Sequence, residues 1–173
     1  MIRQHFLDTL SCVLSSVIRP QIRLLDIGAG AGFPGIPLKI YNPTMYLTAV
    51  DAASKKIIFL RQLCRALDLQ NVECVAARLE PQVSCVSSLP GHSFDVIVSR
   101  AVGSIPYLLE LAAPFLAPGG YVLLQRGHIG KQEISDDPRL LWETGFQVVK
   151  IAEVNFSFFT YPRNLIIFAK FST

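Results

Sequence analysis

The sequence predicts an α/β protein built on one sheet of seven strands, mostly parallel, with helices on both faces. Apolar runs alternate with helix-compatible segments along most of the chain, which is the pattern of βαβ units. The first apolar run, 22–28, ends in a glycine-rich turn and a helix start, as in Rossmann-like folds. The last two apolar runs, 146–151 and 164–171, suit an antiparallel hairpin that closes the sheet.

In the first half of the chain, proline and serine mark the helix ends. A helix at 2–18 is expected to end before Pro20, because proline restricts the residue that precedes it. The helix at 33–41 carries Pro34 in its first turn, where a missing N–H does little harm. Ser54 is a suitable N-cap for the next helix. The expected segments are helix 2–18, strand 22–28, helix 33–41, strand 45–50, helix 54–67 and strand 72–76.

In the second half, turn residues separate the elements. Proline, serine and glycine in 81–93 indicate a surface loop, and Pro118-Gly119-Gly120 indicates a turn. Gly145 suits the end of a helix. The expected segments are strand 94–99, helix 105–116, strand 121–125, helix 135–143 and strands 146–151 and 164–171.

Composition favours a globular protein with a sizeable core. The chain has 173 residues, of which 51% are hydrophobic and 17% charged, and its net charge is +3. That charge is compatible with RNA binding without demanding it. We expect 1–20 to form an amino-terminal helical region and 21–173 to form one α/β domain.

No targeting, membrane or metal signal is evident. No run of 18 apolar residues occurs, and we expect a cytoplasmic, monomeric chain. The cysteines form no C-x-x-C pair and no His/Cys cluster with metal spacing, so we expect them to be small buried side chains. They are Cys12, Cys64, Cys74 and Cys85.

The glycine turn favours a ligand that carries positive charge. Asp26 lies two residues before the first glycine, at the tip of the first strand. A carboxylate there would repel a dinucleotide pyrophosphate, whereas S-adenosylmethionine carries a sulfonium and an ammonium. The glycines of the turn are Gly28, Gly30, Gly32 and Gly35.

A nicotinamide oxidoreductase remains an alternative at this point. The segment from Gly30 to Gly35 fits G-x-G-x-x-G, and Asp51 follows Gly30 by 21 residues, near the spacing of a ribose-binding acid. A turn with a purely structural role is the other alternative.

Each strand end offers a polar group where open α/β sheets bind ligands. Asp51 has two oxygens that can accept from both ribose hydroxyls, although it can also cap a helix. Glu80 can meet an adenine edge or be a solvated loop charge. Arg100 follows the fourth strand and can hold the methionine carboxylate or an RNA phosphate, or form a surface salt bridge.

Later cations and aromatic residues are candidates for RNA contact. Arg126 can contact phosphate or guanine O6, and Arg163 lies between the last two strands. His128 is expected to be an exposed loop residue. Four aromatic residues suit base stacking or core packing: Phe156, Phe158, Phe159 and Tyr161.

Taken together, these segments resemble the bacterial small-subunit ribosomal RNA guanine-N7 methyltransferases (RsmG, formerly GidB). The specific matches are Gly-Phe-Pro-Gly-Ile-Pro at 32–37 and Ser-Arg-Ala at 99–101. The resemblance covers nearly the whole chain and implies the S-adenosylmethionine-dependent methyltransferase fold. The matching segments are 3–9, 26–37, 55–62, 77–80 and 94–101.

The resemblance implies both a cofactor pocket and an RNA partner, and no membrane. Positions matching Gly28, Phe33, Leu79, Glu80 and Arg100 bind the cofactor in that family, and our reading of the residues adds Asp26, Asp51, Gly30 and Gly32. The RNA of the small ribosomal subunit is the implied substrate, with three candidate contacts: His5, Arg126 and Arg163.

Two departures from the family pattern have consequences. Family members have additional helices at the amino end, so the resemblance implies a short form in which 1–20 is the remnant of a longer helical region. A lysine is usual where this chain has Arg126, and a planar guanidinium replaces a compact point charge there. A cofactor- or RNA-binding module without activity is therefore a further alternative.

Overall fold

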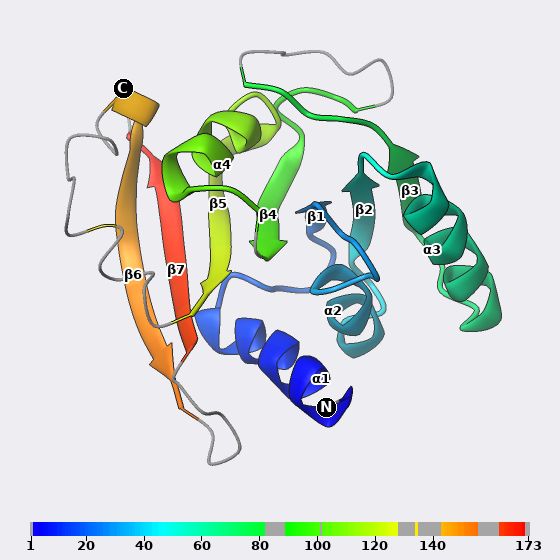
Figure 1. The fold of residues 1–173 in the computed structure, drawn as a ribbon. Coiled ribbons are helices and arrows are strands. Elements are labelled where there is room, and N and C mark those ends of the chain that lie inside the picture. Colours follow the sequence, from blue (N-terminus) through cyan, green and yellow to red (C-terminus); the bar gives the residue numbers. More distant parts are fainter. Residues whose placement is uncertain are drawn as a thin grey trace.

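The computed structural model describes residues 2–81, 89–100, 102–127, 134, 143–155 and 163–171, with side chains from Phe6 onward. Its centre is one seven-stranded sheet with the strand order β3-β2-β1-β4-β5-β7-β6 (Figure 1). The first five strands of that order are parallel, β7 is antiparallel to β5, and β6 is antiparallel to β7. The strands are β1 Arg23–Ile27, β2 Tyr46–Asp51, β3 Val72–Ala76, β4 Phe94–Arg100, β5 Leu116–Arg126, β6 Phe146–Val154 and β7 Arg163–Lys170.

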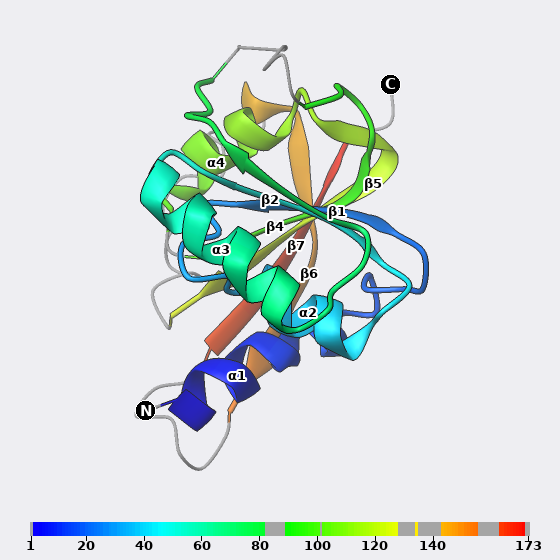
Figure 2. The same cartoon turned by 90° about the vertical axis from the view of Figure 1, so that its right-hand side faces the viewer.

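Buried residues pack on both faces of the sheet, as a central parallel sheet requires. Successive residues of β1 pack into different hydrophobic clusters. Leu24 packs into the cluster that includes residues of α2, α3 and η1, and Leu25 packs into the cluster that includes residues of α4. Figure 2 shows α4 above the strands and α2 below them. The predicted sheet, its closing hairpin and helices on both faces are confirmed. The helices are α1 Ile2–Leu10, the 3-10 helix η1 Ser11–Ser15, α2 Gly35–Tyr41, α3 Ser54–Ala66 and α4 Ile105–Ala112.

The first helix is shorter than predicted. An α-helix to residue 18 is wrong, because α1 ends at Leu10 and a 3-10 turn follows. The Ser11 hydroxyl donates to the Asp8 carbonyl at 2.5 Å, and a serine that bonds the preceding turn competes with α-helical pairing. Ser16 then takes a left-handed conformation (φ 65°) and ends the segment.

The boundary between α4 and β5 also differs from the prediction. The helix ends at Ala112, not at 116, and β5 already begins at Leu116. The predicted turn Pro118-Gly119-Gly120 therefore lies inside β5, where the pairing with β4 shifts register between Phe94 and Val96. The other described boundaries lie within three residues of their predictions. Most of the predicted helix 135–143 lies outside the described residues, as does Cys85, whereas Cys12, Cys64 and Cys74 are buried as expected.

The helix α1 lies across one end of the sheet. Figure 1 shows it running between α2 and the ends of β5 and β7. Two aromatic rings connect it with the glycine turn, since Phe6 on α1 meets Phe33 edge-on at a centroid distance of 5.2 Å. Residues from the amino terminus are thereby brought to the carboxyl edge of the parallel strands, where such sheets bind ligands.

Candidate cofactor and substrate site

The turn after β1 is held by hydrogen bonds to the end of β2. The backbone N–H groups of Gly28 and Ala29 donate to the Val50 carbonyl at 2.9 and 3.0 Å. The buried Asp51 carboxylate accepts from the Gly30 N–H through Oδ2 at 3.0 Å and from the Ala53 N–H through Oδ1 at 2.9 Å. Lys56 Nζ lies 3.4 Å from the same Oδ2. Asp51 therefore ties the glycine turn to the segment that starts α3.

The glycines of this segment have different reasons for lacking a side chain. A Cβ at Gly28 would lie 2.5 Å from Val102 Cγ2, and one at Gly35 would lie 2.7 Å from Asp26 Oδ2. A Cβ at Gly32 would lie 2.7 Å from Ile36 Cγ1. At Gly30 the nearest atom is the Gly28 carbonyl oxygen at 3.8 Å, so the space is open, although the φ of +58° disfavours other residues. Gly30 is thus the position at which a ligand has room to approach the backbone.

Asp26 lies beneath the turn. Its side chain is fully buried, and Oδ2 accepts from the Gly35 N–H at 2.8 Å, while Oδ1 has no hydrogen-bond partner among the described residues. Burial raises the pKa of Asp26 to about 7, the Gly35 hydrogen bond opposes this rise, and the Asp51 charge adds to it. Asp26 therefore positions the start of α2, and its carboxyl binds a proton more tightly than a carboxyl in water does. A direct contact with cofactor stays a prediction.

A pocket opens beside the turn, between the ends of β1, β2 and β3 and the start of α4. Its volume is about 170 Å³. Three predicted cofactor residues line it: Gly28, Asp51 and Leu79. Glu80 is exposed and is not among the lining residues. The remaining lining residues are Ile27, Val50, Ala52, Ala77, Arg78, Val102, Tyr107 and Leu111.

The residues of this pocket fit the adenosine part of S-adenosylmethionine. One carboxylate, Asp51, stands at the rim of a mostly apolar wall, and a carboxylate has lone pairs beyond those used by Gly30 and Ala53. The open space at Gly30 lies on the same turn. A ribose needs acceptors for two hydroxyls, and a flat base needs apolar side chains, so both requirements are met.

On the other side of the turn, Arg100 at the end of β4 lies over the ring of Phe33, with Cζ 5.9 Å from the ring centroid. Its Nη1 also lies 3.9 Å from Oδ2 of Asp8, which α1 contributes. Arg100 therefore forms a salt bridge, as one alternative expected, although its side chain is only 24% exposed, and its contact with the cofactor stays a prediction. Phe33 and Arg100, both predicted cofactor residues, are brought together here.

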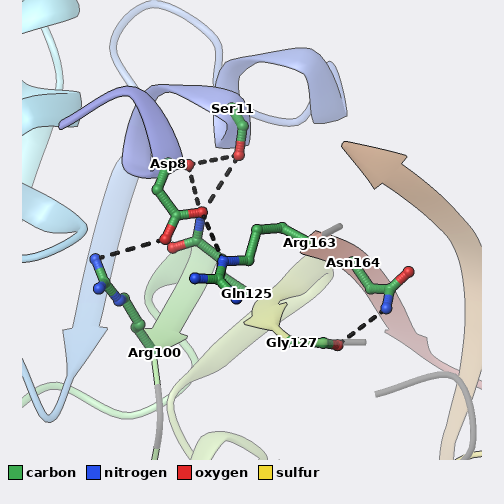
Figure 3. Close-up of polar contacts among 7 residues, drawn as sticks. All are labelled: Asp8, Ser11, Arg100, Gln125, Gly127, Arg163 and Asn164. Carbon is green, nitrogen blue, oxygen red and sulfur yellow. Dashed lines mark hydrogen bonds and ion pairs between the residues drawn. The ribbon is translucent and has the colours of Figure 1, made fainter. Parts of the chain in front are cut away.

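The two arginines predicted to meet RNA have protein partners. Arg126 donates through Nη2 to the Val102 and Gly103 carbonyls at 3.2 and 2.9 Å, and so holds the segment after β4. The Nε of Arg163 lies 3.5 Å from Oδ1 of Asp8. Arg163 and Arg100 therefore share one carboxylate, as Figure 3 shows.

Two residues of this cluster, Asp8 and Gln125, were not among the predicted site residues. Asp8 is 4% exposed, and Gln125 donates through Nε2 to its Oδ1 at 2.9 Å and to its backbone carbonyl at 2.5 Å. A signal for Asp8 was present, because it is the one charge that interrupts the apolar stretch 6–18. Gln125 carried no comparable signal.

Several predicted residues fall outside the described part of the chain. The structure does not describe His128 or the four aromatic residues, nor does it describe the side chain of His5 on α1. The aromatic residues are Phe156, Phe158, Phe159 and Tyr161. The RNA contact of His5 stays a prediction, as do the exposed loop position of His128 and the two alternatives, base stacking or core packing, for the aromatic residues. Within the described residues, no helix has the length and apolar character needed to cross a membrane.

Comparison with protein families gives a match over residues 1–160 to the model described as "GidB: rRNA small subunit methyltransferase G". A ribosomal RNA small subunit methyltransferase G from Alkaliphilus metalliredigens is 36% identical over 168 residues, which are 96% of this chain and 69% of that protein. The protein of the same name from Deinococcus deserti is 35% identical over 98% of this chain and 69% of its own length.

Solved structures share the fold at lower identity. A SAM-dependent methyltransferase from Aquifex aeolicus superposes with a TM-score of 0.72 at 19% identity, covering 96% of this chain and 92% of that one. Fibrillarin from Aeropyrum pernix, in complex with S-adenosyl-L-methionine, gives a TM-score of 0.69 at 17% identity over 92% of this chain and 74% of its own. Both comparisons confirm the predicted fold class.

Proposed function

Because the chain belongs to the rRNA small subunit methyltransferase G family, we propose that it transfers a methyl group from S-adenosylmethionine to N7 of a guanine in small-subunit ribosomal RNA, in the cytoplasm. The observation that carries the proposal is the joining of Asp51 to the Gly30 turn beside the 170 Å³ pocket. The family takes precedence over the nicotinamide alternative, which rested on the glycine spacing and on the distance along the chain from Gly30 to Asp51.

The two sides of the glycine turn would hold different parts of the cofactor, the adenosine part on one side and the methionine part on the other. Asp51 would accept from the ribose, and Leu79 with its apolar neighbours would contain the adenine. Phe33 and Arg100 would hold the methionine end, since a guanidinium pairs well with a carboxylate. When bound, S-adenosylmethionine supplies an electrophilic methyl group.

The chosen acceptor needs no base from the protein. Guanine N7 has an exposed lone pair and carries no proton that must be removed. The residues of this chain therefore have to align the acceptor and to stabilise the changing charges, as the sulfonium becomes neutral and the guanine becomes cationic. This suits a site in which the described residues offer two guanidinium groups and carboxylates.

A methyl-transfer assay with isotopically labelled S-adenosylmethionine tests the proposal. The substrates are small ribosomal subunits and their RNA, and the product nucleoside is identified by mass spectrometry. We expect 7-methylguanosine. The matched control is the same RNA transcribed with 7-deazaguanosine, in which a carbon replaces N7, and this RNA should accept no methyl group.

A second measurement tests the RNA interface. Affinity for the RNA should fall steeply as salt is raised, because neutralised phosphates release counterions. A different methylated nucleoside would overturn the choice of N7, and absence of transfer to either substrate would overturn the enzymatic proposal.

A further inference from the structure

A buried carboxylate from the first helix lies between two guanidinium groups of the proposed site. Asp8 on α1 has a side chain that is 5% exposed, and it meets Arg163 through Oδ1 at 3.5 Å and Arg100 through Oδ2 at 3.9 Å. Figure 3 shows the two arginines approaching this carboxylate, Arg100 from the end of β4 and Arg163 from the start of β7.

We infer that Asp8 is a positioning residue, whose charge sets the two guanidinium groups for contact with the cofactor and the RNA. The inference rests on the proposed function. It makes α1 part of the methyl-transfer site, because the helix contributes the one carboxylate that both arginines share.

The carboxylate itself is held in place by neutral groups. Gln125 Nε2 donates to Oδ1 at 2.9 Å and to the Asp8 backbone carbonyl at 2.5 Å, and the Ser11 hydroxyl donates to the same carbonyl at 2.5 Å. These bonds come from β5 and from η1, so Asp8 has anchors besides the arginines. We therefore treat Asp8 as the anchored partner, and the long side chains of Arg100 and Arg163 as the groups that it orients.

Charge is the property that matters at this position. Two guanidinium groups at one sheet edge repel each other, and a carboxylate between them offsets that repulsion by attracting both. Burial of Asp8 strengthens both attractions, because solvent screens a buried charge less than an exposed one. The arginine side chains remain 24% and 36% exposed, so they reach the surface at which a substrate arrives.

The two guanidinium groups lead to different parts of the site. Arg100 lies between Asp8 and the ring of Phe33, beside the glycine turn. Arg163 starts the last strand, next to Asn164, whose Nδ2 donates to the Gly127 carbonyl at 3.0 Å. A loss of the charge on Asp8 should therefore affect the cofactor side through Arg100 and the RNA side through Arg163.

The test compares Asp8→Asn with Asp95→Asn in steady-state methyl transfer to small-subunit RNA. Asn keeps the shape of Asp8 and removes its charge. Asp95 is an exposed carboxylate on β4 that accepts from the Arg23 N–H at 2.8 Å, away from the arginine pair, and serves as the matched control. We expect the KM for RNA to rise about tenfold or more in Asp8→Asn, as for loss of a hydrogen-bonded charge, and to stay unchanged in Asp95→Asn.

The split between KM and kcat separates positioning from stability. A variant that only folds less well has fewer active molecules, which lowers kcat and leaves KM unchanged. That result for Asp8→Asn would overturn the inference. In the background of Arg163→Gln, Asp8→Asn should raise KM much less than it does in the parent, whereas equal effects in both backgrounds would also overturn it.

A readout without catalysis completes the test. In protein labelled with ¹⁵N-arginine, the Nε–H signal of Arg163, assigned with Arg163→Lys, should exchange slowly with water in the parent and quickly in Asp8→Asn. Unchanged exchange overturns the inference.

If Asp8→Asn does not fold, Asp8→Glu replaces it. Because Asp8→Glu keeps the negative charge, we expect the KM for RNA to rise less than the tenfold expected for Asp8→Asn. The Nε–H of Arg163 should then still exchange slowly with water. A parent chain that transfers no methyl group to RNA overturns the proposed function, whereas an active parent with an unaffected Asp8→Asn overturns only the inference.

Discussion

The Asp51 carboxylate accepts a hydrogen bond from the Gly30 backbone N–H at 3.0 Å, although the two residues are 21 positions apart. The bond joins the end of β2 to the turn after β1. Since β1 and β2 are adjacent parallel strands, their carboxyl ends lie at the same edge of the sheet. A single side chain thus shapes the glycine turn and stands at the rim of the pocket.

Replacing Asp51 should weaken cofactor binding. We expect Asp51→Ala to cost about 1–3 kcal/mol in the binding of S-adenosylmethionine or its demethylated product, because charge-assisted hydrogen bonds to the ribose are lost. Isothermal titration calorimetry measures this change. Asp68→Ala is the matched control, since Asp68 is an exposed carboxylate after α3 that does not line the pocket. Equal affinities of Asp51→Ala and the parent would remove Asp51 from the site.

Gly30 and Gly119 form a matched pair for testing the glycine turn. Both have positive φ, +58° and +72°, and a Cβ at either position meets no atom closer than 3.8 Å. Gly30→Ala and Gly119→Ala should therefore each lose about 1–2 kcal/mol of stability through backbone strain. Of these two variants, only Gly30→Ala should also bind the cofactor more weakly, and Gly30→Val should not bind it at all. Calorimetric titration of the folded variants with S-adenosylmethionine measures both effects. Similar cofactor binding by both alanine variants would mean that Gly30 serves the fold alone.

The stability of the protein should carry a pH dependence from Asp26. Its pKa is raised to about 7 in the folded state from 3.8, so the folded state binds this proton more tightly than the unfolded state does. The contribution is fully present below pH 4 and decreases as the pH rises to about 7. The free energy of unfolding of the parent, relative to that of Asp26→Asn, should fall across this window by up to about 4 kcal/mol. Urea unfolding at several pH values measures it, and a difference independent of pH would contradict the assignment.

Lys39 is a buried cation at the end of α2 that sequence reasoning did not single out. Its ammonium donates to the Pro43 carbonyl at 2.7 Å and to the Met45 carbonyl, and its side chain is 1% exposed. Lys39→Met keeps the apolar stem and leaves both carbonyls without this donor, so we expect a loss of about 2–4 kcal/mol in the free energy of unfolding. Lys55→Met, at an exposed position on α3, should change it by less than about 0.5 kcal/mol. Comparable losses in the two variants would show that the Lys39 ammonium contributes nothing specific.

Local signals predicted most of the sheet. The strand Val72–Ala76 lies where its apolar pattern placed it, because alternation and turn residues are properties of short segments. The end of α1 was not predictable in the same way, since it depends on a bond from Ser11 to the turn before it. The extension of β5 back to Leu116 depends on pairing with Phe94, which no local pattern of Pro118-Gly119-Gly120 reveals.

In the candidate site, too, some features follow from local signals in the sequence and others depend on contacts between distant segments. The position of Asp51 at a strand end predicted its place at the pocket, whereas the contact of the buried Asp26 carboxylate with Gly35 at the start of α2 was not predicted. The pairing of Arg100 and Arg163 with Asp8 joins elements from the beginning, middle and end of the chain. Spacing in the sequence carries no information about such a meeting, because the folded sheet brings these residues together.

The Asp8 cluster has a consequence for the order of events during synthesis. Asp8 bonds to Gln125, a residue 117 positions later, and to Arg163 in the last strand. The helix α1 leaves the ribosome before the strands of the sheet, yet the buried carboxylate of Asp8 has no cationic partner of this cluster until β4 emerges and lacks the last one until β7 emerges. Contacts of such long sequence separation form late, because closing a long loop must precede them. The nascent chain can therefore form the glycine turn and its bond to Asp51 well before it can form the cluster of Asp8 with Arg163. We expect a newly made molecule to bind the cofactor before it can transfer a methyl group to RNA.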